Sequence, residues 1–184
     1  MIIYLHGFNS SPQSHKAQVM AKHMAARGLA GRYACPALPP LATEAIGEIE
    51  RLEPGGTTCF VGSSLGGFYA TYLAERYGAK AVLLNPAIEP HVGLRAYLGE
   101  QKNLHTGKPY NLTEAHLREW QRLFVPRLTP SRYLLIVETG DEVLDYRQAV
   151  ERYRGAEQVV IPGGDHSLQS FERHLPRILA FAGL

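Results

Sequence analysis

Short β-prone apolar runs alternate with longer amphipathic segments along the chain. The apolar runs predict strands, which lie near residues 2–6, 32–36, 57–62, 80–85, 132–138 and 157–161. Apolar positions spaced three and four residues apart predict helices near residues 14–28, 42–52, 65–77, 113–123, 145–153 and 168–181. This alternation predicts one α/β domain over residues 1–184, a three-layer sandwich with helices on both faces of a mainly parallel sheet of about six strands.

One long segment interrupts this alternation. Residues 86–130 contain no convincing strand, and five prolines and three glycines punctuate them. We therefore expect this segment to be an insertion between two strands of the sheet.

The composition is that of an ordinary globular protein, with 45% apolar and 20% charged residues and a formal net charge of +2. So weak a charge argues against a nucleic-acid partner. The only cysteines, Cys35 and Cys59, form neither a disulfide framework nor a zinc-binding pattern. The first apolar run is too short for a signal peptide, and no segment has the length of a membrane span. We expect a cytoplasmic protein that needs no membrane, metal or cofactor.

A glycine- and serine-rich turn joins a predicted strand to a predicted helix. Its sequence is Gly62-Ser63-Ser64-Leu65-Gly66, the Gly-x-Ser-x-Gly pattern of a nucleophile elbow. The sharp turn exposes the hydroxyl of Ser64, and the glycines avoid Cβ clashes where the chain doubles back. A turn without chemical function would show the same composition, so the assignment depends on finding a base and an acid elsewhere.

Asp141 is the candidate for the acid and His166 the candidate for the base, and they follow Ser64 in the expected order of serine, acid and histidine. Each follows a predicted parallel strand, on the side of the sheet where α/β proteins bind ligands. The histidine takes the serine proton, and the carboxylate holds the histidine in the required tautomer. Asp145 is the second candidate for the acid. The other carboxylates considered are Glu138, Glu142 and Asp165, and the histidines expected at the surface are His15, His23, His105 and His116.

The loop after the first strand is the candidate oxyanion loop, and it begins His6-Gly7-Phe8-Asn9. Acyl transfer places negative charge on a carbonyl oxygen, and fixed backbone N–H groups stabilise that charge. We expect these donors to be the N–H groups of Phe8 and Leu65, with His6 bracing the loop.

The chain resembles the bacterial YqiA-like esterases of the α/β-hydrolase superfamily. The shared stretches cover residues 4–12, 38–40, 61–67, 85–87, 97–99, 139–150 and 163–166. Residues 139–150 are far more specific than the elbow. One position departs from the pattern, because Asp165 stands where close relatives are expected to have asparagine.

The resemblance implies an α/β-hydrolase fold that lacks the N-terminal edge strands and uses Ser64, Asp141 and His166 to hydrolyse small carboxylic esters or acyl-CoA-type thioesters. It also implies that residues 86–130 form a short cap. We expect His6, Asn9, Tyr97 and Trp120 to line the substrate pocket, together with Tyr110, Leu123 and Phe124. The alternative is that Trp120, Leu123 and Phe124, at helical spacing, only pack the cap onto the body.

Two other functions are compatible with the same residues: an acyltransferase on this fold, and a non-catalytic binding module that retains the scaffold. The sequence does not predict the oligomeric state.

Overall fold

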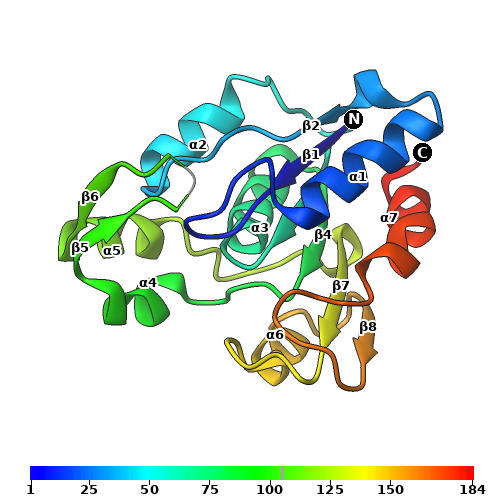
Figure 1. The fold of residues 1–184 in the computed structure, drawn as a ribbon. Coiled ribbons are helices and arrows are strands. Elements are labelled where there is room, and N and C mark those ends of the chain that lie inside the picture. The colour runs from blue at the N-terminus through cyan, green and yellow to red at the C-terminus, as the bar shows by residue number, and fades with distance from the viewer. Residues whose placement is uncertain (105) are drawn as a thin grey trace.

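A computed structural model describes residues 1–104 and 106–184, and its centre is a six-stranded sheet (Figure 1). The strands are β1 (Ile2–Leu5), β2 (Tyr33–Ala34), β3 (Cys59–Ser63), β4 (Lys80–Leu84), β7 (Tyr133–Glu138) and β8 (Glu157–Ile161). Their order is β2-β1-β3-β4-β7-β8, and every neighbouring pair is parallel. The six predicted strands are therefore confirmed.

The six predicted helices are also present, and a short seventh, at Pro90–Gly93 in the insertion, was not predicted. They are α1 (His15–Ala26), α2 (Ala42–Glu50), α3 (Leu65–Tyr77), α4 (Pro90–Gly93), α5 (Glu114–Arg122), α6 (Tyr146–Arg152) and α7 (Leu175–Ala182). The last helix begins later than expected, because a 3₁₀ turn at Phe171–His174 precedes it and proline at position 176 is tolerated only in a first helical turn. Within the described part of the chain, no helix combines the length and apolar composition needed to cross a membrane.

Alternate side chains of the central strands enter two separate cores. In β1, Ile3 and Leu5 pack with α2 and α3, whereas Ile2 and Tyr4 pack with α1 and α7 on the opposite face. The strands are apolar on both faces because helices cover both. The three predicted layers are thus present.

The strand order places a natural binding site between β1 and β3. From β1 the chain crosses through α1 to the edge strand β2, whereas from β3 it crosses through α3 in the other direction to β4. The loops at the carboxyl ends of β1 and β3 therefore diverge and leave a crevice. The predicted oxyanion loop and the predicted elbow are these two loops.

The insertion contains a hairpin that the sequence did not predict. Strands β5 (Gly99–Lys102) and β6 (Pro109–Leu112) pair antiparallel, with Gly99 opposite Leu112 and Lys102 opposite Pro109. The expectation that residues 86–130 contain no strand is therefore wrong. These strands are short and mostly polar, so they lack the apolar alternation that marks a half-buried strand.

Candidate active site

Ser64 lies at the joint between β3 and α3 in a backbone conformation that is rare for a residue with a side chain. Its φ is 54° and its ψ is −121°. The neighbouring chain holds this conformation: the N–H of Ser64 donates to the carbonyl of Leu84 at 3.0 Å, and its own carbonyl accepts from Gly67 and Ala87. The elbow is thereby fixed to the end of β4, and a strained residue at such a site is a pointer to function.

The glycines around Ser64 are needed for close packing. A Cβ on Gly62 would lie 2.2 Å from the carbonyl oxygen of Gly66, and one on Gly66 would lie 1.9 Å from that of Leu5. A Cβ on Gly67 would lie 2.6 Å from the Cβ of Pro86. The elbow therefore presses directly against β1 and the loop after β4, as the sequence predicted for its glycines.

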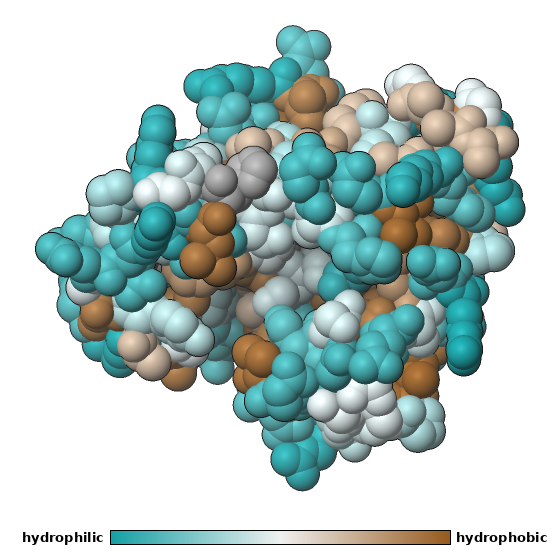
Figure 2. Space-filling model, in the orientation of Figure 1, coloured by the Kyte–Doolittle hydropathy of each residue, from teal (hydrophilic) through white to brown (hydrophobic). Residues whose placement is uncertain are grey.

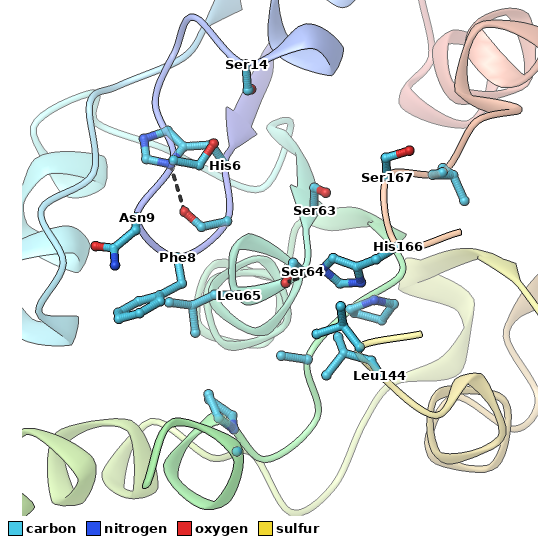
Figure 3. Close-up of a pocket in the computed structure, with 18 of the residues that line it drawn as sticks. His6, Phe8, Asn9, Ser14, Ser63, Ser64, Leu65, Leu144, His166 and Ser167 are labelled. Carbon is cyan, nitrogen blue, oxygen red and sulfur yellow. Dashed lines mark hydrogen bonds between the residues drawn. The ribbon is translucent and has the colours of Figure 1, made fainter. Parts of the chain in front are cut away.

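The structure brings Ser64, His166 and Asp141 together, although 102 residues separate the first two. Nε2 of His166 lies 3.1 Å from Oγ of Ser64, and Nδ1 lies 2.8 Å and 3.0 Å from the two carboxylate oxygens of Asp141. Figure 3 shows the imidazole beside the serine hydroxyl. The side chain of His166 is 23% exposed, whereas that of Asp141 is 1% exposed. This arrangement suits proton transfer from the hydroxyl to the imidazole.

Asp141 is held independently of the histidine. Its Oδ1 accepts hydrogen bonds from the backbone N–H groups of Val143 and Leu144 at 2.9 and 2.8 Å. Asp145, the second candidate, caps α6 through the N–H of Arg147 and pairs with the guanidinium of that residue.

The other three carboxylates that were considered also have partners other than the imidazole ring. Asp165 accepts from Ser167 and Gln169, and these hydrogen bonds hold its pKa below the usual value. Glu142 accepts from the backbone N–H of His166 at 3.0 Å. Glu138 is buried and accepts from the same loop. The extra charge at position 165 is thus directed into its own turn.

The loop after β1 lies against the elbow. A Cβ on Gly7 would lie 3.3 Å from the Cβ of Ser64, so the backbone at this point touches the candidate nucleophile. Figure 3 shows Phe8 and Leu65 next to each other and close to Ser64. The assignment of the N–H groups of Phe8 and Leu65 as oxyanion donors stays a prediction.

The predicted pocket residues have different roles. His6 is 2% exposed, accepts from the N–H of Leu38 through Nε2, and contacts the carbonyl of Gly7 through Nδ1, so it braces the loop (Figure 3). Asn9 accepts from the hydroxyl of Tyr110 on β6 at 2.9 Å.

Of the predicted aromatic pocket residues Tyr97 and Trp120, Tyr97 faces the cavity and Trp120 does not. Tyr97 lines the cavity, and its ring packs edge-on against that of Phe8, with the two ring centroids 6.0 Å apart. Trp120 is fully buried away from the cavity, and its indole N–H donates to the hydroxyl of Tyr69 on α3 at 2.8 Å. The pocket assignment of Trp120 is therefore corrected: this side chain packs the insertion onto the body.

A cavity of about 1460 Å³ opens over Ser64 and is visible as the hollow at the centre of Figure 2. Exposed apolar side chains line it at Val92, Tyr97 and Leu104 of the insertion and at Val143 of the loop after β7. Polar side chains line it at Ser14, Lys16 and Ser167. Such a lining suits a substrate with an apolar and a polar part.

Four histidines were expected at the surface, and the three of them that the structure describes lie outside the cluster of Ser64, Asp141 and His166. His15 is exposed, His23 and His116 are half-buried, and His105 lies outside the described residues. Among residues 1–104 and 106–184, no three His, Cys, Asp or Glu side chains are grouped as metal ligands would be.

Comparison with known proteins places these observations in a family. The model of an uncharacterised protein family, UPF0227, matches residues 1–183 of the chain.

Solved structures with the same architecture include mouse α/β hydrolase domain-containing protein 10, with a TM-score of 0.70, 15% identity, and coverage of 97% of this chain and 87% of that one. A structure reported for the metagenome-derived lipolytic enzymes LipS and LipT has a TM-score of 0.70, 20% identity, and coverage of 99% and 92%. Est1E from Butyrivibrio proteoclasticus has a TM-score of 0.66, 16% identity, and coverage of 98% and 85%. The fold is therefore that of the α/β hydrolases, as predicted.

Proposed function

We propose that this chain, which belongs to the UPF0227 (YqiA) family and has the α/β-hydrolase fold, hydrolyses carboxylic esters through an acyl-enzyme formed on Ser64. The observation that supports this proposal is the continuous chain of contacts from Ser64 Oγ through the His166 ring to the buried carboxylate of Asp141. Structural neighbours named as lipolytic enzymes and as an esterase domain are consistent with it.

In the first half-reaction, Oγ of Ser64 attacks the ester carbonyl while Nε2 of His166 takes the hydroxyl proton. The carbonyl oxygen becomes an oxyanion, which the N–H groups of Phe8 and Leu65 stabilise. Collapse of this intermediate breaks the bond to the alcohol, and His166 returns the proton to the leaving oxygen. Loss of one such oxyanion donor typically costs about 2.7–4 kcal/mol in the transition state.

In the second half-reaction, water attacks the acyl-enzyme. His166 again removes a proton, and collapse of the second oxyanion releases the acid and restores the hydroxyl of Ser64. The Asp141 carboxylate holds the proton on Nδ1 throughout, so that Nε2 is free to accept, and it stabilises the imidazolium formed in each step.

The substrate we propose is a small acyl ester, with an acyl thioester as a second leaving-group class. The apolar side chains that line the cavity, such as Val92, Leu104 and Val143, suit the acyl part, and the polar side chains suit the leaving group.

The experiment is hydrolysis of a series of p-nitrophenyl esters and matching acyl thioesters by the wild type and by Ser64→Ala. We expect the substitution to lower kcat by roughly 10⁴–10⁶-fold, as removal of a triad nucleophile does elsewhere. A fluorophosphonate probe should label the wild type, and fragmentation of the labelled peptide should place the label on Ser64 and not on Ser63.

Full activity in Ser64→Ala would refute the proposal. An unlabelled, inactive wild type would indicate a binding module instead. Ester formation with an added alcohol in preference to hydrolysis would indicate an acyltransferase.

A further inference from the structure

A second buried carboxylate near the site has no part in the mechanism above. Glu138, the last residue of β7, is 1% exposed. Its oxygens accept hydrogen bonds from the backbone N–H groups of Asp165 at 2.9 Å, Gln169 at 3.0 Å and Ser170 at 2.8 Å. All three donors belong to the turn that bears His166.

These hydrogen bonds keep Glu138 charged. Burial raises the pKa of a carboxyl group, but the bonds from Ser170, Asp165 and Gln169 outweigh that effect, and the pKa of Glu138 lies below its usual value. A buried carboxylate without such donors would be strongly destabilising. The backbone of the turn is therefore folded around the buried carboxylate of Glu138.

The approach between turn and carboxylate is so close that it requires glycine. A Cβ on Gly164 would lie 1.9 Å from Oε2 of Glu138, and the φ of Gly164 is +71°. No other residue fits there without moving the turn or the carboxylate.

Asn85 connects the same turn to the elbow. Its Oδ1 accepts from the N–H of Glu138 at 3.0 Å, and its Nδ2 donates to the carbonyl of Asp165 at 3.0 Å and to that of His166 at 3.4 Å. The preceding residue, Leu84, accepts the N–H of Ser64. The turn that bears the base and the backbone of the nucleophile are thus hydrogen-bonded to two adjacent residues, Asn85 and Leu84, at the end of β4.

We propose that Glu138 is a positioning residue for the base: its buried carboxylate fixes the turn 165–170 and so places Nε2 of His166 at Ser64. Only the effect of this placement on catalysis rests on the proposed function. Displacement of a reacting group by about 1 Å costs on the order of 100-fold in rate. A carboxamide in place of this carboxylate would turn an N–H₂ group toward one of the backbone donors and displace the turn.

The test compares Glu138→Gln with Glu75→Gln. Glu75 is a matched control because its side chain is 15% exposed and accepts hydrogen bonds from the backbone and hydroxyl of Thr129 and from the hydroxyl of Tyr133, away from the cavity. We expect both variants to lose stability. Only Glu138→Gln should lower kcat, by about 10–100-fold, with KM little changed.

A second readout does not depend on ester hydrolysis. NMR of the imidazole nitrogens and of the Nδ1 proton reports the bond from His166 to Asp141, and these signals should shift or broaden in Glu138→Gln and stay unchanged in Glu75→Gln. If the wild type hydrolyses no ester, the proposed function fails but this measurement still decides the role of Glu138.

If Glu138→Gln does not fold, Asn85→Asp tests the same connection. It keeps the shape of the side chain but replaces the Nδ2 donor by an oxygen facing the carbonyls of Asp165 and His166. The same loss of kcat and the same changes in the His166 signals are expected. Unchanged His166 signals and kcat in a folded Glu138→Gln or Asn85→Asp protein, or an equal loss of kcat in Glu75→Gln, would overturn the proposal.

Discussion

The Asp141 carboxylate lies 2.8 Å from Nδ1 of His166, whereas Asp145, four residues later, is directed away to Arg147. Both aspartates follow the same strand in the same short loop. The backbone N–H groups of Val143 and Leu144 hold the first toward the imidazole, and helix capping holds the second at the start of α6.

This difference predicts unequal effects of Asp141→Asn and Asp145→Asn. An asparagine at 141 favours the wrong imidazole tautomer, and we expect kcat to fall by about 10⁴-fold. Asparagine caps a helix as well as aspartate does, so Asp145→Asn should change kcat far less. Steady-state kinetics on one ester measures both variants, and the reverse order would transfer the acid role to Asp145.

The contact between Gly66 and β1 predicts a large loss of stability in Gly66→Ala. The added Cβ would lie 1.9 Å from the carbonyl oxygen of Leu5, so α3 and β1 must move apart, at a cost of about 1–3 kcal/mol or more. Gly47 in α2 is the control, because nothing lies within 4 Å of the Cβ position.

For Gly47→Ala we expect a gain of about 0.5–1 kcal/mol, since alanine is the better helix former. Urea denaturation gives both values. Equal stability in the two variants would contradict the packing described for the elbow.

Burial predicts that both thiols are unreactive in the folded protein. It raises the pKa of Cys35 to about 11 and that of Cys59 to about 12. Because the thiolate is the reactive form and only a small fraction of either thiol is ionised at pH 8, both cysteines should react slowly. Iodoacetamide should leave ester hydrolysis intact and modify both cysteines only after denaturation, as mass spectrometry would show. Rapid loss of activity with modification of Cys35 in the native protein would contradict this.

The lowered pKa of Glu75 predicts that the protonation of this carboxylate contributes to the loss of stability in acid. Burial raises the pKa of Glu75, but the hydrogen bonds from Thr129 and Tyr133 and the charge of Arg132 lower it by more. The pKa therefore lies below the ordinary value of 4.5. A lowered pKa in the folded state means that the carboxylate stabilises the fold above about pH 4.5 and that this contribution disappears as the pH falls through the folded-state pKa.

The difference in unfolding free energy between the wild type and Glu75→Gln should therefore be constant from about pH 5.5 to 7, where Glu75 is charged in both the folded and the unfolded state. The difference should shrink below about pH 4.5. Urea denaturation at a series of pH values measures it. A difference that stays the same down to pH 3 would show that Glu75 is not stabilised in its charged form.

The sequence predicted the sheet and the cluster around Ser64 well because both depend on strong local signals. Each strand is a buried apolar run, and Ser64, Asp141 and His166 each follow a strand end. Parallel strands bring such ends to one edge of the sheet, so order along the chain was enough to predict their meeting.

The insertion was harder to predict because its signals are weak. The hairpin strands β5 and β6 are polar, and the apolar spacing of Trp120 does not show whether the ring faces a pocket or the body. The structure resolves this through a partner distant in sequence, the Tyr69 hydroxyl. The role of Glu138 was missed for the same reason, since its three donors lie 27 to 32 residues away.

Residues 86–130 leave the sheet after β4 and return at its neighbour β7, whereas the serine, acid and histidine lie on other connections. Changes in the length of this segment therefore leave the chain positions of the serine, the acid and the histidine untouched, as long as the bonds from Trp120 to Tyr69 and from Tyr110 to Asn9 are kept.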